Sequence, residues 1–580
     1  MAIHLFPRRT HASANATFAL LPLAFVSLSA LAQTAPAPTV PGAGQALQQL
    51  EPATIKAPTP AGPPALRIEP ARSGLASAEA STPIAVKTIE LSGNTVFDTA
   101  TLQALVADAP GSTQTLAQLD ALAQRITAYY RAHGQPLASA YLPVQTMTDG
   151  VLRIRVVEVT YGRVTVDNRS RIRTARLDAF AAPLQPGELV AQAPLDRTLL
   201  LLRELSGVEV SADARPGAQP GSTDLTITAV DAARTSGSYA LDSQGSKAAG
   251  RARAIGSIDL SNHLGLGETF NAVAVTSGRG LNYGRLGLQM PVNGSGTRAG
   301  LGYAQLQYAL GDVFANLNAH GSAVVVDGFV QQALVRSTQA TVNTDLRLEH
   351  KTLKDRIDLT GTRTDRTVTS ATAGLDGVLR DQWGGGGTSA FSLGYTAGHV
   401  AFDDATALGV DQSATGARTQ GQYGRANLML TRLQRLGSAP ALADTTLFAS
   451  FRAQGASKNL DNSEQISIAG PQGVRGYDVN ALSGAQGYVA SVELRQMLAA
   501  TPSGTWQAKT FVDMGHATVY KDVFSAAPNS ASMRSVGVGL NWVAPAGWNA
   551  QLVVARPVGA VPAIAADRST RVWLTVGGRF

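Results

Sequence analysis

One arginine surrounded by glycines is the first feature of this chain that could do chemistry. Arg475 stands in the stretch GPQGVRGYDV, residues 470–479, among Gly470, Gly473 and Gly476. Glycine loses more conformational entropy on ordering than other residues, so this spacing argues against a helix or a regular strand. A guanidinium is a permanent cation with a planar set of donors. The stretch predicts a loop that folds sharply around one fixed cation.

The sequence FVDMG, residues 511–515, supplies a candidate counter-charge. Phe511 and Asp513 share one face if this segment is a strand, because strand side chains alternate. If that face is turned inward, Asp513 is an enclosed carboxylate, and Arg475 offers it a bidentate partner. The alternative is an incidental arginine in a mobile, exposed loop, and composition alone leaves the two interpretations equal.

Composition excludes several other kinds of chemistry. The chain has 580 residues, no cysteine and a formal net charge of +7 without a long basic run. The absence of cysteine rules out disulfides, thiolate metal sites and cysteine nucleophiles. The sequence has no H-E-x-x-H, G-x-S-x-G or G-x-x-x-x-G-K-[ST] motif. We therefore expect no enzymatic activity, no metal, no cofactor and no nucleic-acid partner.

The N-terminus carries a targeting pattern. Two arginines precede an apolar run at residues 18–32, which ends in Ala-Leu-Ala. This pattern predicts a secretory signal peptide over residues 1–32, cut after Ala32. The alternative is a membrane anchor, but ~15 apolar residues fall short of the ~20 that span a bilayer.

Between the signal peptide and the end of the chain, three regions differ in pattern. Residues 33–83 are rich in Ala and Pro and predict a linker, with one possible short helix at residues 45–50. Residues 84–159 follow the order strand, two helices, two strands, and residues 160–230 repeat it. Each repeat predicts a small α+β module. The remainder, residues 231–580, shows the period-2 alternation of strands.

This last region predicts a transmembrane antiparallel β-barrel. In SVGVGLNWV, Val536 and Val538 alternate with Ser535 and Gly537, and the chain ends on the aromatic residue Phe580. Apolar outward and small or polar inward residues suit a barrel in lipid with a wet interior. At about 20 to 22 residues per strand and connection, the length predicts about 16 strands. A soluble β-sandwich or propeller is the less favoured alternative.

The combination of these features resembles a known family. SNHLGLGE at residues 261–268, VRGY in the glycine-rich stretch and F-x-D-x-G about 35 residues later all follow two small modules. This arrangement resembles the TpsB transporters of two-partner secretion, of the haemolysin-activator and filamentous-haemagglutinin-transporter type, within the BamA-related outer-membrane superfamily. The resemblance extends over residues 84–580.

The resemblance implies a place for each part. The modules at residues 84–159 and 160–230 would be periplasmic POTRA domains, and the barrel would lie in the bacterial outer membrane. Residues 462–487 would form an extracellular loop folded back into the lumen. Arg475 and Asp513 would then form a loop–barrel lock. The motif residues that support this lock would be Val474, Gly476, Tyr477, Phe511 and Gly515. Phe580 would be the C-terminal barrel signal.

Relatives of this type commonly begin with an amphipathic helix that plugs the pore. The possible helix at residues 45–50 is short and its surroundings are rich in proline, so the sequence does not predict a plug.

The function implied by the resemblance is secretion of one large exoprotein of the haemolysin or adhesin type. The POTRA domains would recognise this partner, which can add a strand to a sheet edge. The other partners would be outer-membrane lipid and the barrel-assembly machinery that inserts the chain, which we expect to be a monomer. Two alternatives stay open: an assembly factor of the BamA type, which usually has more POTRA modules, and a passive porin.

Overall fold

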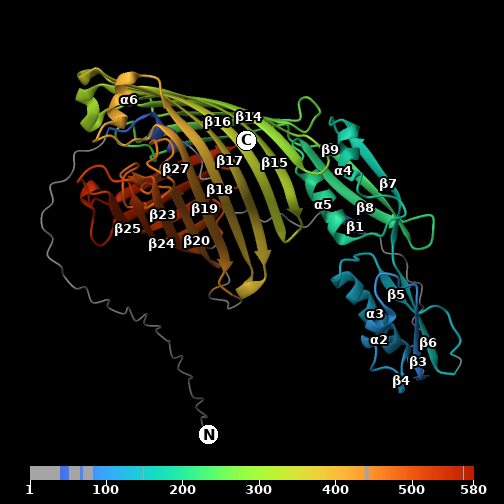
Figure 1. Cartoon of the computed structure of the whole chain (residues 1–580). Helices are drawn as coiled ribbons and strands as arrows, with labels where there is room; N and C mark the ends of the chain where they lie inside the picture. The colour runs from blue at the N-terminus through green and yellow to red at the C-terminus, as the bar shows by residue number, and fades with distance from the viewer. Residues whose placement is uncertain are drawn as a thin grey trace, which may run out of the picture.

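The chain forms a barrel with two small modules beyond one of its ends. In Figure 1 the second module lies next to the barrel and the first module lies farther out. The predicted signal peptide, residues 1–32, lies outside the described residues. No helix in the described part of the chain is long and apolar enough to cross a membrane. The computed structural model describes residues 40–50, 66–68, 83–147, 149–437, 442, 444–498, 500–565 and 567–580.

The first module packs two helices on a three-stranded sheet of order β3-β6-β5, with a two-stranded sheet, β2-β4, beside it. Thr115 and Gln118 form a capping box at the start of the longer helix, and Gly134 follows its end at φ +88°. The elements are β2 (Ile84–Val86), β3 (Thr88–Ser92), α2 (Thr99–Ala104), β4 (Ser112–Gln114), α3 (Leu116–Ala132), β5 (Ser139–Tyr141) and β6 (Val151–Val157).

The second module repeats this plan and gains one strand. Its sheet has the order β1-β8-β9-β7, in which β1 comes from the N-terminal linker and runs parallel to β8. Nothing in the sequence predicted this added strand. The elements are β1 (Leu66–Ile68), β7 (Thr160–Arg169), α4 (Thr174–Ala181), α5 (Gln192–Arg203), β8 (Val208–Pro216) and β9 (Ser222–Asp231).

Sixteen antiparallel strands close the barrel, which confirms the predicted fold class. The closing pair joins β10 to β27 between Ser238–Arg579 and Asp242–Thr575. The strands are β10 (Thr235–Asp242), β11 (Arg253–Ser261), β12 (Thr269–Thr276), β13 (Leu281–Pro291), β14 (Thr297–Ala309), β15 (Ala319–Arg336), β16 (Ala340–Ile357), β17 (Thr362–Asp381), β18 (Gly387–Phe402), β19 (Gly421–Arg435), β20 (Thr445–Ala456), β23 (Gln486–Met497), β24 (Thr505–Thr518), β25 (Ser530–Val543), β26 (Asn549–Pro557) and β27 (Arg571–Arg579).

Alternation along the strands sorts side chains between the outer and inner faces. On β24, Val512 and Met514 are exposed, whereas Phe511 and Asp513, which alternate with them, are buried. Lipid requires an apolar outer surface, and the enclosed face can carry polar groups. The predicted alternation therefore has the predicted polarity: Asp513 faces the interior.

Short helices and strands occupy the barrel connections and the linker. The helix expected at residues 45–50 begins two residues earlier, and it lies inside the barrel rather than in a free linker. The elements are α1 (Ala43–Gln48), the connection helix α6 (Ala405–Gln412), the connection strands β21 (Ile466–Ser467) and β22 (Ser483–Gly484), and the 3-10 helices η1 (Asp312–Leu317), η2 (Asp358–Thr360), η3 (Trp383–Gly385) and η5 (Ala563–Ala565).

The SNHLGLGE stretch is a turn that docks the second module onto the barrel. The carboxylate of Glu268 accepts hydrogen bonds from the backbone amides of Leu264 (2.7 Å) and Leu266 (3.0 Å), which fixes the turn. The amide of Arg173, at the start of α4, then donates to the carbonyl of Gly265 at 2.9 Å. This motif therefore orients the module nearest the barrel.

Two further turns complete the docking. Arg336, at the end of β15, donates through Nε to Glu204 Oε1 at 2.7 Å. Arg197 on α5 donates to the carbonyls of Ser295 (2.9 Å) and Ala333 (2.8 Å). These contacts join one module to three successive turns, so the module and the barrel are held in a defined orientation.

Gly294 tests how tight this docking is. A Cβ at this position would lie 1.9 Å from the carbonyl oxygen of Ala179 on α4. Gly294→Ala must therefore push the module away from the barrel, at a cost of ~1–3 kcal/mol. We expect faster tryptic cleavage at Arg234, between the module and the barrel. Gly284→Ala is the matched control, since nothing lies within 4 Å of its Cβ position; equal cleavage of the two variants would contradict the docking.

Candidate functional site

The longest described connection of the barrel folds back into its lumen. Residues 457–485 join β20 to β23, at the end of the barrel opposite the modules, and we call them the inner loop. Val474 and Tyr477 are fully buried, and they pack with Ala517 and Met533 of the barrel wall. The VRGY motif is thus part of an apolar cluster between loop and wall, and is not exposed to solvent.

Arg475 contacts the wall through both its backbone and its side chain. Its backbone amide donates to Asp513 Oδ2 at 3.1 Å, its Nε donates to the same oxygen at 3.0 Å, and Nη2 donates to Oδ1 at 2.6 Å. Asp513 has no exposed surface. This is the bidentate arginine–carboxylate geometry, which is among the strongest and most directional of protein ion pairs.

Neighbouring strands complete the shell around this pair. Arg475 Nη1 donates to Glu493 Oε1 at 2.5 Å, and Nη2 donates to Ser491 Oγ at 2.9 Å. The hydroxyls of Ser491 and Ser535 donate to Asp513 at 2.8 and 3.0 Å. Both serines are the register partners of Asp513, on β23 and β25. We call these five residues the Arg475 anchor.

Aromatic side chains enclose the guanidinium. Its central carbon lies 3.4 Å from the centroid of the Phe511 ring, within the range of a cation–π contact. Trp573 on β27 donates through Nε1 to the carbonyl of Arg475 at 2.8 Å. The arginine is therefore held on its planar face, on its edge and at its backbone.

Two glycines allow the loop to approach the wall this closely. A Cβ on Gly476 would lie 2.7 Å from Cβ of Ser535 and 2.8 Å from the backbone nitrogen of Pro557. A Cβ on Gly515 would lie 2.5 Å from Ile468, a buried residue of the inner loop. Any larger residue at either position would have to displace the loop or the wall.

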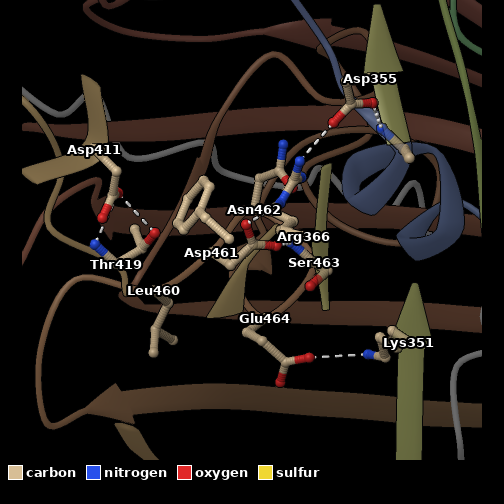
Figure 2. Close-up of polar contacts among 12 residues, drawn as sticks. Lys351, Asp355, Arg366, Asp411, Thr419, Leu460, Asp461, Asn462, Ser463 and Glu464 are labelled. Atoms are coloured by element: carbon tan, nitrogen blue, oxygen red, sulfur yellow. Dashed lines mark hydrogen bonds and ion pairs between the residues drawn. The ribbon is translucent and has the colours of Figure 1, made fainter. Parts of the chain in front are cut away.

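A second group of charges holds the first arm of the inner loop, as Figure 2 shows. Arg366 on β17 donates to Asp461 (2.5 Å) and to Asn462 (2.8 Å), both in the loop. The same side chain donates to Asp355 on β16 at 2.7 Å. We call these four residues the Arg366 network.

Glu464 forms a further contact next to this network. It is fully buried, and Lys351 Nζ donates to its Oε1 at 2.9 Å. Arg425 on β19 lies 3.1 Å from its other carboxylate oxygen. Burying a charge without partners is costly, so this carboxylate also ties the loop to two strands.

Helix α1 lies between the inner loop and the opposite wall. The backbone amide of Ala43 donates to Asp355 Oδ1 at 2.7 Å. Gln48 Nε2 donates to the loop carbonyls of Asn462 (2.9 Å) and Gln465 (2.5 Å). Ala43, Ala46 and Leu47 pack in one buried cluster with β14–β16. The helix therefore occupies the lumen, although its short sequence gave no prediction either way about a plug.

The structure brings together all but one of the site residues named from the sequence. Arg475, Asp513 and Phe511 are in direct contact, and the remaining motif residues pack around them. Phe580 is separate and 67% exposed; its backbone pairs with Gly237 at the barrel's closing strands. The chemistry of the site is ion pairing. Among the described residues no group of three or more His, Cys, Asp or Glu could hold a metal ion.

Sequence reasoning missed the other members of the Arg475 anchor and the whole Arg366 network. Ser491 and Glu493 stand two apart on one strand, so their shared inward face was readable from the alternation. Nothing in the sequence shows which inward residue of β16 or β17 lies opposite residues 461–464, because the path of a long loop is set by tertiary contacts.

Asp513→Ala tests the energetic weight of the anchor. The change leaves Arg475 buried beside Glu493 alone, and breaking a buried pair costs ~3–5 kcal/mol. We expect a lower thermal unfolding temperature in detergent micelles and trypsin cleavage at Arg475. Asp381→Ala is the control, because its side chain is 41% exposed whereas Asp513 is fully buried. If the two variants unfold at the same temperature, and Arg475 stays protected from trypsin in Asp513→Ala, the anchor has no role in stability.

Gly44→Val tests the seating of α1. A Cβ at Gly44 would lie 2.3 Å from Asn462 Oδ1 and 2.6 Å from the amide nitrogen of Ser463. Valine must therefore displace α1 from the lumen, and we expect a higher single-channel conductance in planar bilayers. Gly409→Val on α6 is the control, since nothing lies within 4 Å of its Cβ position. Unchanged conductance in Gly44→Val would contradict the assigned position.

Comparison with known proteins agrees with this geometry. The family model for the haemolysin secretion/activation protein ShlB/FhaC/HecB matches residues 221–542, and the ShlB-type POTRA domain matches residues 84–158. The chain is 25% identical over 456 residues to HuxB of Haemophilus influenzae, described as a heme/hemopexin transporter protein. This match covers 77% of the chain and 79% of HuxB.

Solved structures share the fold. The structure of CdiB from Escherichia coli has a TM-score of 0.66 at 20% identity, covering 88% of this chain and 93% of CdiB. A BamA structure from Haemophilus ducreyi, lacking POTRA domains 1–3, has a TM-score of 0.53 at 13% identity, covering 86% and 100% of the two chains. The family match supports a transporter rather than an assembly factor of the BamA type. The chain thus belongs to the ShlB/FhaC/HecB family of TpsB transporters, which secrete partner exoproteins across the bacterial outer membrane.

Proposed function

We propose that this transporter passes one large exoprotein, of the haemolysin or adhesin type, as an extended chain through its lumen. The barrel lies in the outer membrane and the POTRA domains lie in the periplasm. In this proposal the Arg475 anchor is a permanent strut, and α1 is the part that moves. The transporter acts as a monomer, and it has no catalytic or metal-dependent step.

The observation that carries this division is the unequal attachment of α1 and the inner loop. Arg475 joins a bidentate buried ion pair to a second carboxylate, whereas α1 has hydrogen bonds through Ala43 and Gln48. Breaking a buried ion pair costs ~3–5 kcal/mol, whereas the bond from Ala43 to a carboxylate contributes ~1.5–3 kcal/mol and each bond from Gln48 to a carbonyl ~0.5–1.5 kcal/mol. Each polar contact of α1 is therefore no stronger than the ion pair that holds the inner loop, which supports α1 as the part that moves.

The partner would first meet the outermost sheet edge. In the first POTRA domain β5 is an edge strand, and in the described part of the chain no strand pairs with its outer side. Tyr141 at its end is 42% exposed and Val144, three residues on, is fully exposed. An extended segment can add to such an edge through backbone hydrogen bonds, while apolar side chains supply selectivity.

Measuring secretion by the Arg475→Ala variant tests whether the Arg475 anchor is a permanent strut. The measured quantity is the amount of the exoprotein encoded beside this transporter that reaches the medium. We expect a drop of about tenfold or more, because one lost buried pair changes an equilibrium by at least that factor. Arg432→Ala, from the partly exposed pair with Asp381, is the control and is expected to secrete normally.

The levels of folded barrel in the membrane must be measured in parallel, by heat-modifiability. Secretion at the wild-type rate by Arg475→Ala, with normal barrel levels, would refute the strut. If deletion of the transporter leaves secretion of this exoprotein unchanged but lowers the levels of other outer-membrane barrels, the protein would be an assembly factor. Solute flux without any secreted partner would instead point to a porin.

A further inference from the structure

Two arginines stand on the outer face of the barrel, at the upper edge of its apolar band. On β25, Arg534 follows the exposed Val536 on the same outward face, in the direction that leads away from the modules. On β26, Arg556 follows Val554 in the same way. Both arginines are exposed. Because the modules lie in the periplasm, both guanidinium groups are at the level of the outer-leaflet headgroups.

The two arginines are neighbours across this strand pair. The register joins Val536 to Arg556 and Ser535 to Pro557, so Arg534 lies diagonally next to Arg556 on the outward face. The Cα atoms of such diagonal neighbours are ~7–8 Å apart, which is within reach of long side chains. The two guanidinium groups can therefore converge on one anion, and without an anion they repel each other.

In the described part of the chain, neither arginine has a carboxylate partner. Arg534, Arg556 and the exposed Arg568, in the connection to β27, form no ion pair or side-chain hydrogen bond with a described residue. On another part of the rim an outward arginine is paired, since Arg356 at the end of β16 donates through Nη2 to Asp365 at 2.9 Å. The rim over β25 and β26 therefore carries cations without a counter-ion.

The carboxylates of the flanking connections are engaged or held elsewhere. Asp567 lies 2.6 Å from Arg571 and forms an ion pair with it. The backbone of Asp522, in the connection between β24 and β25, forms two hydrogen bonds with the side chain of Asn459 in the inner loop, at 2.8 and 2.9 Å. The anion that the two arginines favour therefore comes from outside the chain.

A cavity opens next to Arg534 on the same rim. It has a volume of about 430 Å³, and its lining includes Ser530, Ser532 and Arg534 together with the apolar Val561 and Pro562. Ligand sites typically combine an apolar lining with a few polar groups. A sugar ring has hydroxyl groups and an apolar face, so this lining suits a sugar beside the group that Arg534 binds.

The same two strand positions support the inner loop from the other side of the wall. Ser535 and Pro557 are the sequence neighbours of the two arginines, and they are the residues that a Cβ on Gly476 of the VRGY motif would meet first. An anion held by both arginines joins β25 to β26 at this register pair. Binding on the outer face therefore stabilises the surface against which the inner loop packs.

We propose that Arg534 and Arg556 form a binding site for a phosphorylated glycolipid of the outer leaflet. The two guanidinium groups bind one phosphate of its headgroup through charge-assisted hydrogen bonds. The cavity at Ser530 and Ser532 takes the adjoining sugar, and the acyl chains run along the apolar face of β25 and β26. The bound lipid clamps these strands together behind the Arg475 anchor. This site belongs to the barrel itself and is independent of which exoprotein crosses the lumen.

Arg534→Gln combined with Arg556→Gln tests the site, because glutamine removes both charges and keeps a polar side chain. The full-length protein in detergent micelles is titrated with lipid A that carries two phosphates, and bound lipid is measured by native mass spectrometry. We expect the apparent Kd of the double variant to rise about tenfold or more, since each cation at the membrane surface strengthens binding of an anionic headgroup. Arg356→Gln is the matched control, because this outward arginine already has Asp365 as its partner, and it is expected to keep wild-type affinity.

Two further probes identify the group that is bound. Dephosphorylated lipid A is expected to bind the wild type as weakly as intact lipid A binds the double variant. Intact lipid A is expected to raise the unfolding temperature of the wild type but not that of the double variant, because a ligand of the folded state stabilises it. Inorganic phosphate is expected to leave the unfolding temperature of both proteins unchanged.

Several results would overturn the proposal. Equal affinity of intact lipid A for the wild type and the double variant, with both folded by heat-modifiability, would show that the arginines do not bind it. Equal affinity of the wild type for intact and dephosphorylated lipid A would show that the acyl chains alone are bound. Stabilisation by inorganic phosphate as large as that by lipid A would show an anion site without a lipid. Reduced secretion by the double variant, with unchanged lipid binding, would show that the arginines contact the exoprotein instead.

Discussion

A carboxylate buried in the wall of a membrane barrel must have partners, and this requirement organises the site. Asp513 has no exposed surface, so its charge would be costly without Arg475 and the two serine hydroxyls. Satisfying it requires the inner loop to enter the lumen, two glycines to permit close approach, and an aromatic ring to cover the guanidinium. This charge therefore fixes the tip of the inner loop against the wall.

The same principle operates at the other arm of the loop, with a different consequence. Asp461 and Glu464 are buried acids whose partners come from β16, β17 and β19. The loop is thus pinned at separated points on the barrel circumference. A loop held in this way divides the lumen and creates the surface against which α1 packs.

The sequence was informative where the cause was local. Alternation on β24 put Phe511 and Asp513 on one face, and alternation with chain length predicted about sixteen strands. The pairing of Arg475 with Asp513 was expected from the resemblance to TpsB transporters. The position of α1 could not be predicted. Its six residues are too few to form a stable helix in water, and contacts with Asp355 and Asn462, distant in sequence, hold it. The strand at residues 66–68 escaped detection for a similar reason, because a three-residue pairing has no periodicity.

Asp355 has a property that bears on repeated use of the transporter. Its carboxylate accepts from Ala43 of α1, but also from Tyr308 at 2.6 Å and from Arg366 at 2.7 Å. When α1 departs, two of these donors remain, so the charge stays compensated and the receptor for the helix keeps its shape. A preformed receptor requires no refolding on re-entry. In the proposed mechanism the same short helix would therefore bind this receptor again and reseal the lumen after each passage.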